Sequence, residues 1–263
     1  MTQRTVPAAL FDGIQSLDVT GPMEVFAGAS RAPGVSYDLH TASLDGGPVR
    51  ARNARAKCRG ESWARAARAS TARSASGAPG AEVVCVAERT GPLANDSGSL
   101  HLVAHQTFAE VPSPDLVIVP GGPGQDDQME NATLLGWLRA VDATTTWTTS
   151  VCTGSLLLAA AGLLKGRRAT SHWLALEALK EFGAEPTGER VVFDGKYVTA
   201  AGVSSGIDMG LTLLGRIAGD DTARSVQLLT EYDPQPPYDC GSPEKAPAAL
   251  VEEWRARSRH IIR

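Results

Sequence analysis

Cys152 occupies a position where a cysteine side chain is suited to act as a nucleophile. It follows residues 145–151, a β-branched run that predicts a strand, and it precedes Thr-Gly-Ser and an apolar run typical of a helix. A turn this tight lifts the side chain out of the sheet, as at the nucleophile elbows of α/β hydrolases. The positive end of the following helix favours the thiolate, and the backbone N–H groups point toward developing negative charge. By spacing alone, a nucleophilic cysteine and a buried structural cysteine are equally favoured interpretations.

Two glycines close the predicted strand that comes before this one. Residues 115–122 read Asp-Leu-Val-Ile-Val-Pro-Gly-Gly, a continuous apolar run typical of a parallel strand covered on both faces. Gly121 and Gly122 therefore stand at the carboxyl end of a strand, where open α/β sheets bind ligands. We interpret the pair both as a turn and as a source of backbone amides for a substrate.

Short apolar runs alternate with helical patterns along the chain, which indicates an α/β sheet with crossover helices. Strands are predicted at residues 6–10, 36–42, 115–122 and 145–151, with a hairpin at 190–199. A helix is predicted after Asp18, with Thr20 as its cap and Pro22 in its first turn. Further helices are predicted at residues 156–164, 173–182, 206–217, 222–232 and 246–259. We expect a single domain over residues 1–263.

Residues 50–80 do not follow this pattern. The segment is rich in Arg, Ala, Ser and Gly, contains one acidic residue, Glu61, and has little hydrophobic periodicity. We interpret it as a low-complexity surface insertion that the fold and the activity do not need. Binding of an anionic partner by this segment is the less favoured alternative.

Composition narrows the class of protein. The chain has 263 residues, of which 43% are hydrophobic and 21% charged, and its net charge of −4 disfavours a nucleic-acid-binding surface. Its most apolar stretch, residues 155–164, is about half of what a membrane-spanning helix needs. No export signal is recognised, and the scattered cysteines fit neither a disulfide scaffold nor a zinc site, so a cytoplasmic protein is expected. Cys58, Cys85 and Cys240 are expected to pack in the interior.

Several motifs together resemble the ThiJ/PfpI superfamily of glutamine-amidotransferase-like folds. They are Leu-Val-Ile-Val-Pro-Gly-Gly at 116–122, Thr-Ser-Val-Cys-Thr-Gly-Ser at 149–155 and Arg-Arg-Ala-Thr-Ser-His-Trp at 167–173, with Gln-Ser-Leu-Asp-Val-Thr-Gly-Pro at 15–22 and Ala-Gly-Val-Ser-Ser-Gly-Ile-Asp at 201–208. Residues 227–238, which include Pro-Pro-Tyr, and Gly-Ser-Pro at 241–243 resemble the isocyanide hydratases within that superfamily. The resemblance covers nearly the whole chain except residues 50–80.

This resemblance implies a flavodoxin-like sandwich, a homodimer, and hydration of a small-molecule isocyanide to an N-substituted formamide without metal or organic cofactor. By motif, Cys152 is the nucleophile, Asp18 is the carboxylate close to it, and Thr153 follows the nucleophile. Gly121, Gly122 and Gly154 are expected to complete the substrate or oxyanion site. Asp18 alone would be interpreted as a helix cap, and the resemblance favours the acid instead. In the implied scheme the thiolate attacks the isocyanide carbon while Asp18 delivers a proton.

Other activities fit the residues less well. The superfamily's proteases carry a His directly after the nucleophile, where this chain has Thr153, and His172 is interpreted as structural. The main alternative is a non-catalytic ligand-sensing or redox-sensing domain, like those of AraC-type regulators. Those regulators continue into a helix-turn-helix region, whereas this chain ends at Arg263, so no nucleic-acid partner is expected. A glyoxalase or deglycase is a third class, in which relatives usually carry Glu where this chain has Asp18.

Overall fold

The computed structural model describes residues 4–29, 38–42, 48–50 and 81–258. Of the predicted insertion at residues 50–80, only Arg50 falls within these ranges, as the last residue of strand β3 (Pro48–Arg50). The dispensable character of that segment therefore stays a prediction. Cys58 also lies outside the described residues.

One mostly parallel sheet runs through the molecule in the order β12-β13-β9-β8-β1-β4-β2-β3. The antiparallel pairs are β12 with β13 and β2 with β3, at the two ends of the sheet. Its strands are β1 (Arg4–Ala9), β2 (Asp38–Ala42), β3, β4 (Ala81–Ala87), β8 (Leu116–Val119), β9 (Trp147–Val151), β12 (Val191–Asp194) and β13 (Tyr197–Ala200), with β7 (Gln106–Thr107) paired to β4. Two smaller sheets pair β5 (Gly91–Ala94) with β6 (His101–Ala104) and β10 (Arg168–Ala169) with β11 (Glu185–Pro186).

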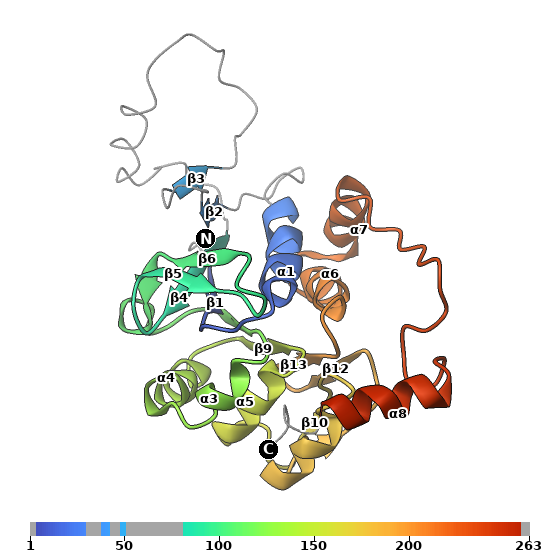
Figure 1. Cartoon of the computed structure of the whole chain (residues 1–263). Helices are drawn as coiled ribbons and strands as arrows, with labels where there is room; N and C mark the ends of the chain where they lie inside the picture. The colour runs from blue at the N-terminus through green and yellow to red at the C-terminus, as the bar shows by residue number, and fades with distance from the viewer. Residues whose placement is uncertain (1–3, 30–37, 43–47, 51–80, 259–263) are drawn as a thin grey trace.

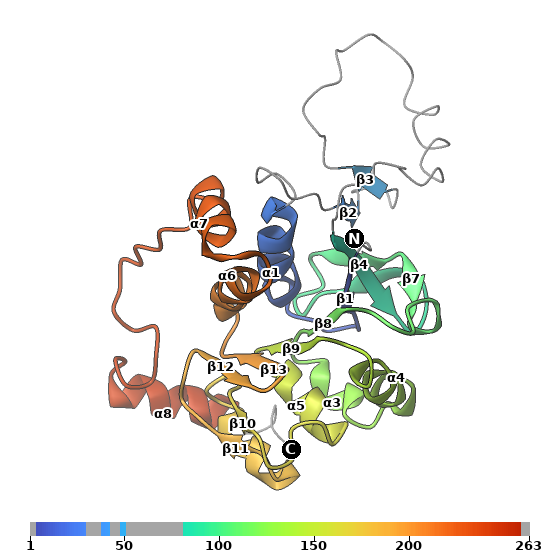
Figure 2. The same ribbon diagram turned by 180° about the vertical axis from the view of Figure 1, so that it is seen from behind.

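Helices cover both faces of this sheet (Figure 1, Figure 2). On one face lie α1 (Ser16–Ala29), α6 (Ser205–Ala218) and α7 (Asp220–Leu229), and on the other lie α3 (Gln125–Gln128), α4 (Ala132–Asp142) and α5 (Gly154–Ala160). A long connection leads from α7 to α8 (Ala248–Arg257), which lies apart from the other helices. The expectation of an α/β sandwich with a mostly parallel sheet is confirmed.

The central strands are buried because both faces are covered. Every residue of β8 and of β13 is buried, as are the last four residues of β9. This is the burial that a continuous apolar run predicts for a parallel strand. The predicted hairpin at residues 190–199 is confirmed by the pairing of Asp194 with Tyr197 across the turn.

The structure corrects three local predictions. Thr20 does not cap the first helix: α1 begins at Ser16, so Thr20 lies within it and donates its hydroxyl to the Ser16 carbonyl oxygen at 3.1 Å. Pro22 is likewise inside the helix rather than in its first turn. Residues 173–182 do not form an α-helix, because Ala175 and Ala178 donate to carbonyls three residues earlier, and only a 3₁₀ helix, η3 (Leu176–Phe182), results.

Two cysteines differ from one another in their surroundings. Cys85 lies in β4 and is buried, which confirms the packing expected for it. Cys240 is exposed, because it belongs to the irregular connection between α7 and α8 rather than to the core. Its predicted burial is therefore wrong.

A second 3₁₀ turn, η2 (Phe108–Glu110), places Phe108 against Trp137 with ring centroids 4.6 Å apart.

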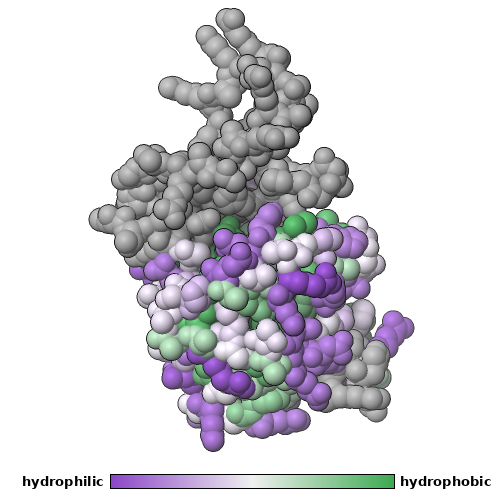
Figure 3. Space-filling view, turned by 90° about the vertical axis from the view of Figure 1, so that its left-hand side faces the viewer, coloured by the Kyte–Doolittle hydropathy of each residue, from purple (hydrophilic) through white to green (hydrophobic). Residues whose placement is uncertain are grey.

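The outer surface is mixed in character. Figure 3 shows, on the side of α4, small hydrophobic areas dispersed among hydrophilic ones. Among the residues with described positions, no helix combines the length and the apolar character needed to cross a bilayer.

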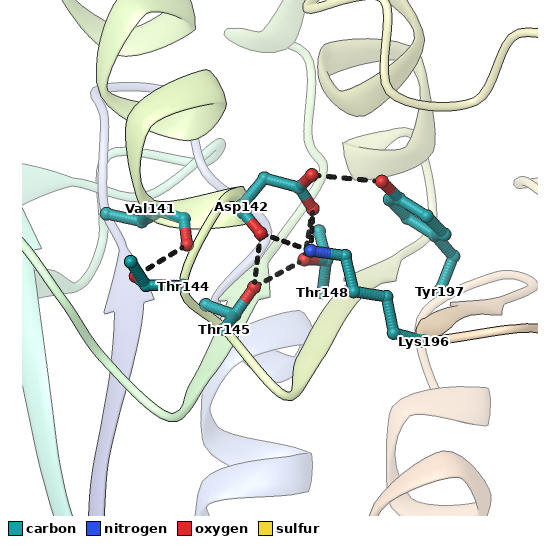
Figure 4. Close-up of polar contacts among 7 residues, drawn as sticks. All are labelled: Val141, Asp142, Thr144, Thr145, Thr148, Lys196 and Tyr197. Atoms are coloured by element: carbon teal, nitrogen blue, oxygen red, sulfur yellow. Dashed lines mark hydrogen bonds and ion pairs between the residues drawn. The ribbon is translucent and has the colours of Figure 1, made fainter.

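A buried polar network joins the end of α4 to the beginnings of β9 and β13 (Figure 4). Asp142 is 9% exposed and accepts hydrogen bonds from the hydroxyls of Thr148 (2.6 Å) and Tyr197 (2.9 Å). Lys196 Nζ lies 3.1 Å from the same carboxylate. Burial and the hydrogen bond to Asp142 raise the pKa of Tyr197 to about 12, which keeps its hydroxyl protonated as a donor. The network therefore fixes where β9 starts.

Removing this carboxylate should destabilise the protein. Asp142→Ala leaves the buried hydroxyls of Thr148 and Tyr197 without their acceptor, and we expect the free energy of unfolding to fall by about 2 kcal/mol. Urea unfolding followed by circular dichroism measures the change. The control Asp221→Ala removes a fully exposed carboxylate from a surface ion pair, and no measurable change is expected. Equal stabilities of the two variants would contradict a structural role for the network.

Candidate active site

Cys152 lies in the turn between β9 and α5 with a strained backbone. Its φ of 58° is positive, a conformation that a residue with a Cβ adopts at a cost of about 1 to 2 kcal/mol. The amide of Cys152 donates to the carbonyls of Ala200 (3.1 Å) and Ala201 (2.9 Å). Its own carbonyl accepts from the hydroxyls of Ser155 and Ser171, each at 3.2 Å. These bonds hold the residue in a conformation it would not adopt alone.

Close backbone contacts bring the end of β8 against this turn. A Cβ on Gly121 would lie 2.5 Å from both the amide nitrogen and Oγ1 of Thr153, and one on Gly154 would lie 2.1 Å from the Val119 carbonyl oxygen. The amide of Gly122, whose φ is 129°, donates to Thr153 Oγ1 at 3.1 Å. Only glycine fits at these contacts. The predicted site residues Gly121, Gly122, Thr153 and Gly154 are thus brought together at one point.

Asp18 reaches the same place from the first turn of α1. Its side chain has no exposed surface, and its Oδ2 accepts the Gly121 amide at 2.9 Å. Oδ1 accepts no hydrogen bond of normal geometry from the described residues. Burial raises the pKa of Asp18 from 3.8 to about 7, although hydrogen bonds from the Gly121 amide and the Cys152 thiol act in the opposite direction. Near neutral pH this carboxyl is therefore able both to give and to take a proton.

The pKa of Cys152 is raised, mainly by burial and further by the negative charge of Asp18. Hydrogen bonds from the amides of Val203 and Thr153 lower it, but they do not outweigh burial. The helix terminus favours the thiolate, as the sequence predicts, but burial acts against it, because the side chain is only 6% exposed. Cys152 and the Asp18 carboxyl thus form one buried, interacting pair.

A cavity of about 600 Å³ opens in front of the cysteine. Cys152, Thr153 and Gly122 line it on the side of the sheet, and Asp18 does not reach its surface. The connection before α8, residues 240–243, and α8 itself also line the cavity. The predicted nucleophile thus faces a space of the size of a small-molecule site, with its carboxylate behind the surface.

Sequence reasoning missed several residues of this cavity. Val203 supplies an amide to the Cys152 sulfur, and the Ala-Gly-Val-Ser-Ser-Gly segment had been noted without a role for it. His172, for which the sequence predicts a structural role, lines the cavity, and burial lowers its pKa. Its ring occupies the space beside Gly202, where a Cβ would lie 2.9 Å from its Cδ2. Cys240 also lines the cavity, through a segment whose path the sequence does not reveal.

Metal ligands do not gather at this site. Within the described ranges, no group of three or more His, Cys, Asp and Glu side chains is arranged to hold a metal ion. The chemistry that the site supports is nucleophilic attack by sulfur combined with proton transfer at a carboxyl.

The contact at Gly121 should tolerate no side chain. Gly121→Ala forces a Cβ into the Thr153 backbone, and we expect the free energy of unfolding to fall by about 1 to 3 kcal/mol. The matched control is Gly136→Ala in α4, where a Cβ meets nothing within 4 Å. That variant should be more stable than the wild type by up to about 1 kcal/mol, because Ala favours the helix. Thermal unfolding of both variants tests this, and equal effects would contradict the close contact.

Asp18 should make stability depend on pH in a particular direction. Its folded pKa of about 7 exceeds its ordinary value of 3.8, so between these pH values the folded state holds the extra proton. The free energy of unfolding therefore falls as pH rises through this window, by at most about 1.4 kcal/mol per pH unit. Urea unfolding at several pH values should show this fall in the wild type and a flatter profile in Asp18→Asn. Asp221→Asn, at an exposed position, should keep the wild-type profile; identical profiles for wild type and Asp18→Asn would be inconsistent with a raised pKa.

Comparison with known proteins places these features in a family. Residues 69–216 match the DJ-1/PfpI family. The isonitrile hydratase of Pseudomonas putida is 45% identical over 180 residues, which are 68% of this chain and 78% of that protein. The HTH-type transcriptional regulator CdhR of Pseudomonas aeruginosa is 40% identical over 95 residues, 35% of this chain and 28% of that protein.

A solved structure extends the likeness to the whole fold. The crystal structure of a THiJ/PfpI family protein from Pseudomonas syringae matches with a TM-score of 0.78 and 29% identity, over 99% of this chain and 88% of that chain. The sheet order and the helices on both faces are those of the flavodoxin-like α/β sandwich predicted from the motifs. The chain belongs to the DJ-1/PfpI family.

Proposed function

We propose that this protein is an isocyanide hydratase that converts an isocyanide into an N-substituted formamide, with Cys152 as nucleophile and Asp18 as general acid and base. The observation that carries the proposal is the buried pair itself: a carboxyl with a pKa of about 7 that interacts with a cysteine held at the wall of a cavity. The 45% identity to the Pseudomonas putida isonitrile hydratase supports the choice of substrate class.

The first step forms a bond between Cys152 sulfur and the terminal carbon of the isocyanide. As the sulfur attacks, the thiol proton passes to Asp18 and from there to the same carbon, which gives the thioimidate R–N=CH–S–Cys152. The amides of Thr153 and Val203 stabilise negative charge on the sulfur during this transfer. Attack thus does not require that Cys152 be a thiolate beforehand, because Asp18 takes the thiol proton as the carbon–sulfur bond forms.

The second step adds water to the thioimidate carbon. Asp18 accepts one water proton and passes it to the nitrogen, which gives the intermediate R–NH–CH(OH)–S–Cys152. The carbon–sulfur bond then breaks, the hydroxyl proton returns to the sulfur through Asp18, and R–NH–CHO leaves. Each proton transfer uses a carboxyl whose pKa lies near neutrality, the condition for efficient general acid and base catalysis.

Loss of the cysteine should abolish the reaction. Cys152→Ala is expected to lower formamide production from benzyl isocyanide by at least about 10⁴-fold, because no covalent intermediate can form. Asp18→Asn should lower kcat by about 10² to 10⁴-fold, the usual contribution of a general acid or base. Mass spectrometry of the wild type under turnover should detect an adduct on Cys152 with the mass of one substrate molecule.

Cys85→Ala is the matched control, since Cys85 is buried in β4 and its pKa is raised to about 12 by burial alone. It should keep wild-type activity. Full hydratase activity in Cys152→Ala would end the proposal. Parallel assays with methylglyoxal and with a peptide test the deglycase and protease alternatives, and isocyanide binding without formamide would favour the sensing domain. The homodimer expected from the motifs forms part of this proposal, and light scattering of the purified protein tests it.

A further inference from the structure

The residues that line the cavity come from distant parts of the chain. Gly122 and Cys152 follow the ends of strands, whereas other lining residues belong to α8 and the connection before it. Helix α8 also approaches the body of the protein at Trp173, where the Arg255 guanidinium lies 5.9 Å from the indole ring centre. Trp173 itself lines the cavity. A helix far along the chain thus lines the same space as the cysteine.

The face of α8 toward the cavity is apolar. Leu250, Val251 and Trp254 line the space, while the charged residues of the helix do not. Val251 is 9% exposed, but Leu250 is 39% and Trp254 50% exposed. Two large apolar side chains are therefore left partly uncovered at the site, where a ligand would bury them and gain free energy in proportion to the area covered.

Charge is scarce around this space. Among the described lining residues, Asp96 is the only Asp, Glu, Lys or Arg, and burial of His172 lowers its pKa, which disfavours its charged form. The Asp96 carboxylate already accepts hydrogen bonds from Gln15 Nε2 (3.2 Å) and the Ser97 amide (2.9 Å). No lysine or arginine of the described chain lines the cavity to compensate an anionic ligand. A negatively charged substituent would lose its hydration without a partner there.

We infer that the face of α8 formed by Leu250, Val251 and Trp254 is the specificity wall of this enzyme, and that it selects uncharged isocyanides with a large apolar substituent. The inference rests on the proposed function. About 600 Å³ is far more than the reacting N–C group fills, so the remaining volume receives the substituent. The wall acts on binding of the substituent and not on the sulfur chemistry.

The test compares kcat/KM for benzyl isocyanide, methyl isocyanide and the isocyanoacetate anion. The wild type should prefer the benzyl compound over the other two. Leu250→Ala and Trp254→Ala should each lower the benzyl-to-methyl ratio by at least about tenfold, the effect of removing apolar contacts from a specificity pocket. Leu228→Ala, which truncates an 80% exposed leucine on α7, is the matched control and should keep the wild-type ratio.

A variant of the opposite kind guards against simple loss of folding. Ala246→Phe adds bulk at another lining position, and it should lower the ratio by excluding the larger substrate. Wild-type ratios in Leu250→Ala, Trp254→Ala and Ala246→Phe alike, or an altered oligomeric state in place of an altered ratio, would overturn the inference while hydration of isocyanides stood. If the wild type produced no formamide from any isocyanide, both the proposed function and the inference would be overturned. If the wild type preferred isocyanoacetate over benzyl isocyanide, only the inference about the wall would be overturned.

Discussion

The hydrogen bond from the Gly121 amide to the Asp18 carboxylate is the interaction on which the site depends. It joins the start of α1 to the end of β8, two segments separated by 103 residues, at a point without solvent. A buried carboxylate without such a donor would be prohibitively costly to desolvate. The Gly121 amide and the Cys152 thiol both hydrogen-bond to this carboxyl, but burial still dominates, and the pKa settles near 7 rather than near 3.8. Because burial outweighs the hydrogen bonds that the carboxyl accepts, it is able to gain and lose a proton near neutral pH.

The strained backbone of Cys152 is likewise held in place by its surroundings. A positive φ is unfavourable for a cysteine, yet its amide donates to two carbonyls and its carbonyl accepts from two hydroxyls, and these bonds hold it. Those partners come from β13's end, from α5 and from the segment around Ser171. The conformation is therefore set by packed elements rather than by the cysteine's own preference, as is usual for strained residues at functional sites.

Much of this arrangement could be predicted from the sequence, because it follows from backbone constraints. A continuous apolar run identifies β8 and a β-branched run identifies β9, and the Gly-Gly and Cys-Thr-Gly segments mark where they end. The ionisation of the pair could not be predicted, since it depends on burial that brings together Asp18 and Cys152 from distant positions. The helix terminus favours the thiolate, whereas burial raises the pKa of Cys152 and acts against it. The position of α8 at the cavity could not be predicted either, because residues 230–247 contain no regular element whose pattern would show where α8 lies.

The Asp142 network and the Cys152 turn hold the two ends of the same strand. β9 is only five residues long, so it is fastened at its beginning through Thr148 and just past its end through the Cys152 amide. In a strand, sliding by one residue turns every side chain to the opposite face. Such a slip would exchange the sulfur for the Val151 side chain at the cavity. The two attachments of β9 thus fix its register, and this register is the one that places the cysteine at the cavity.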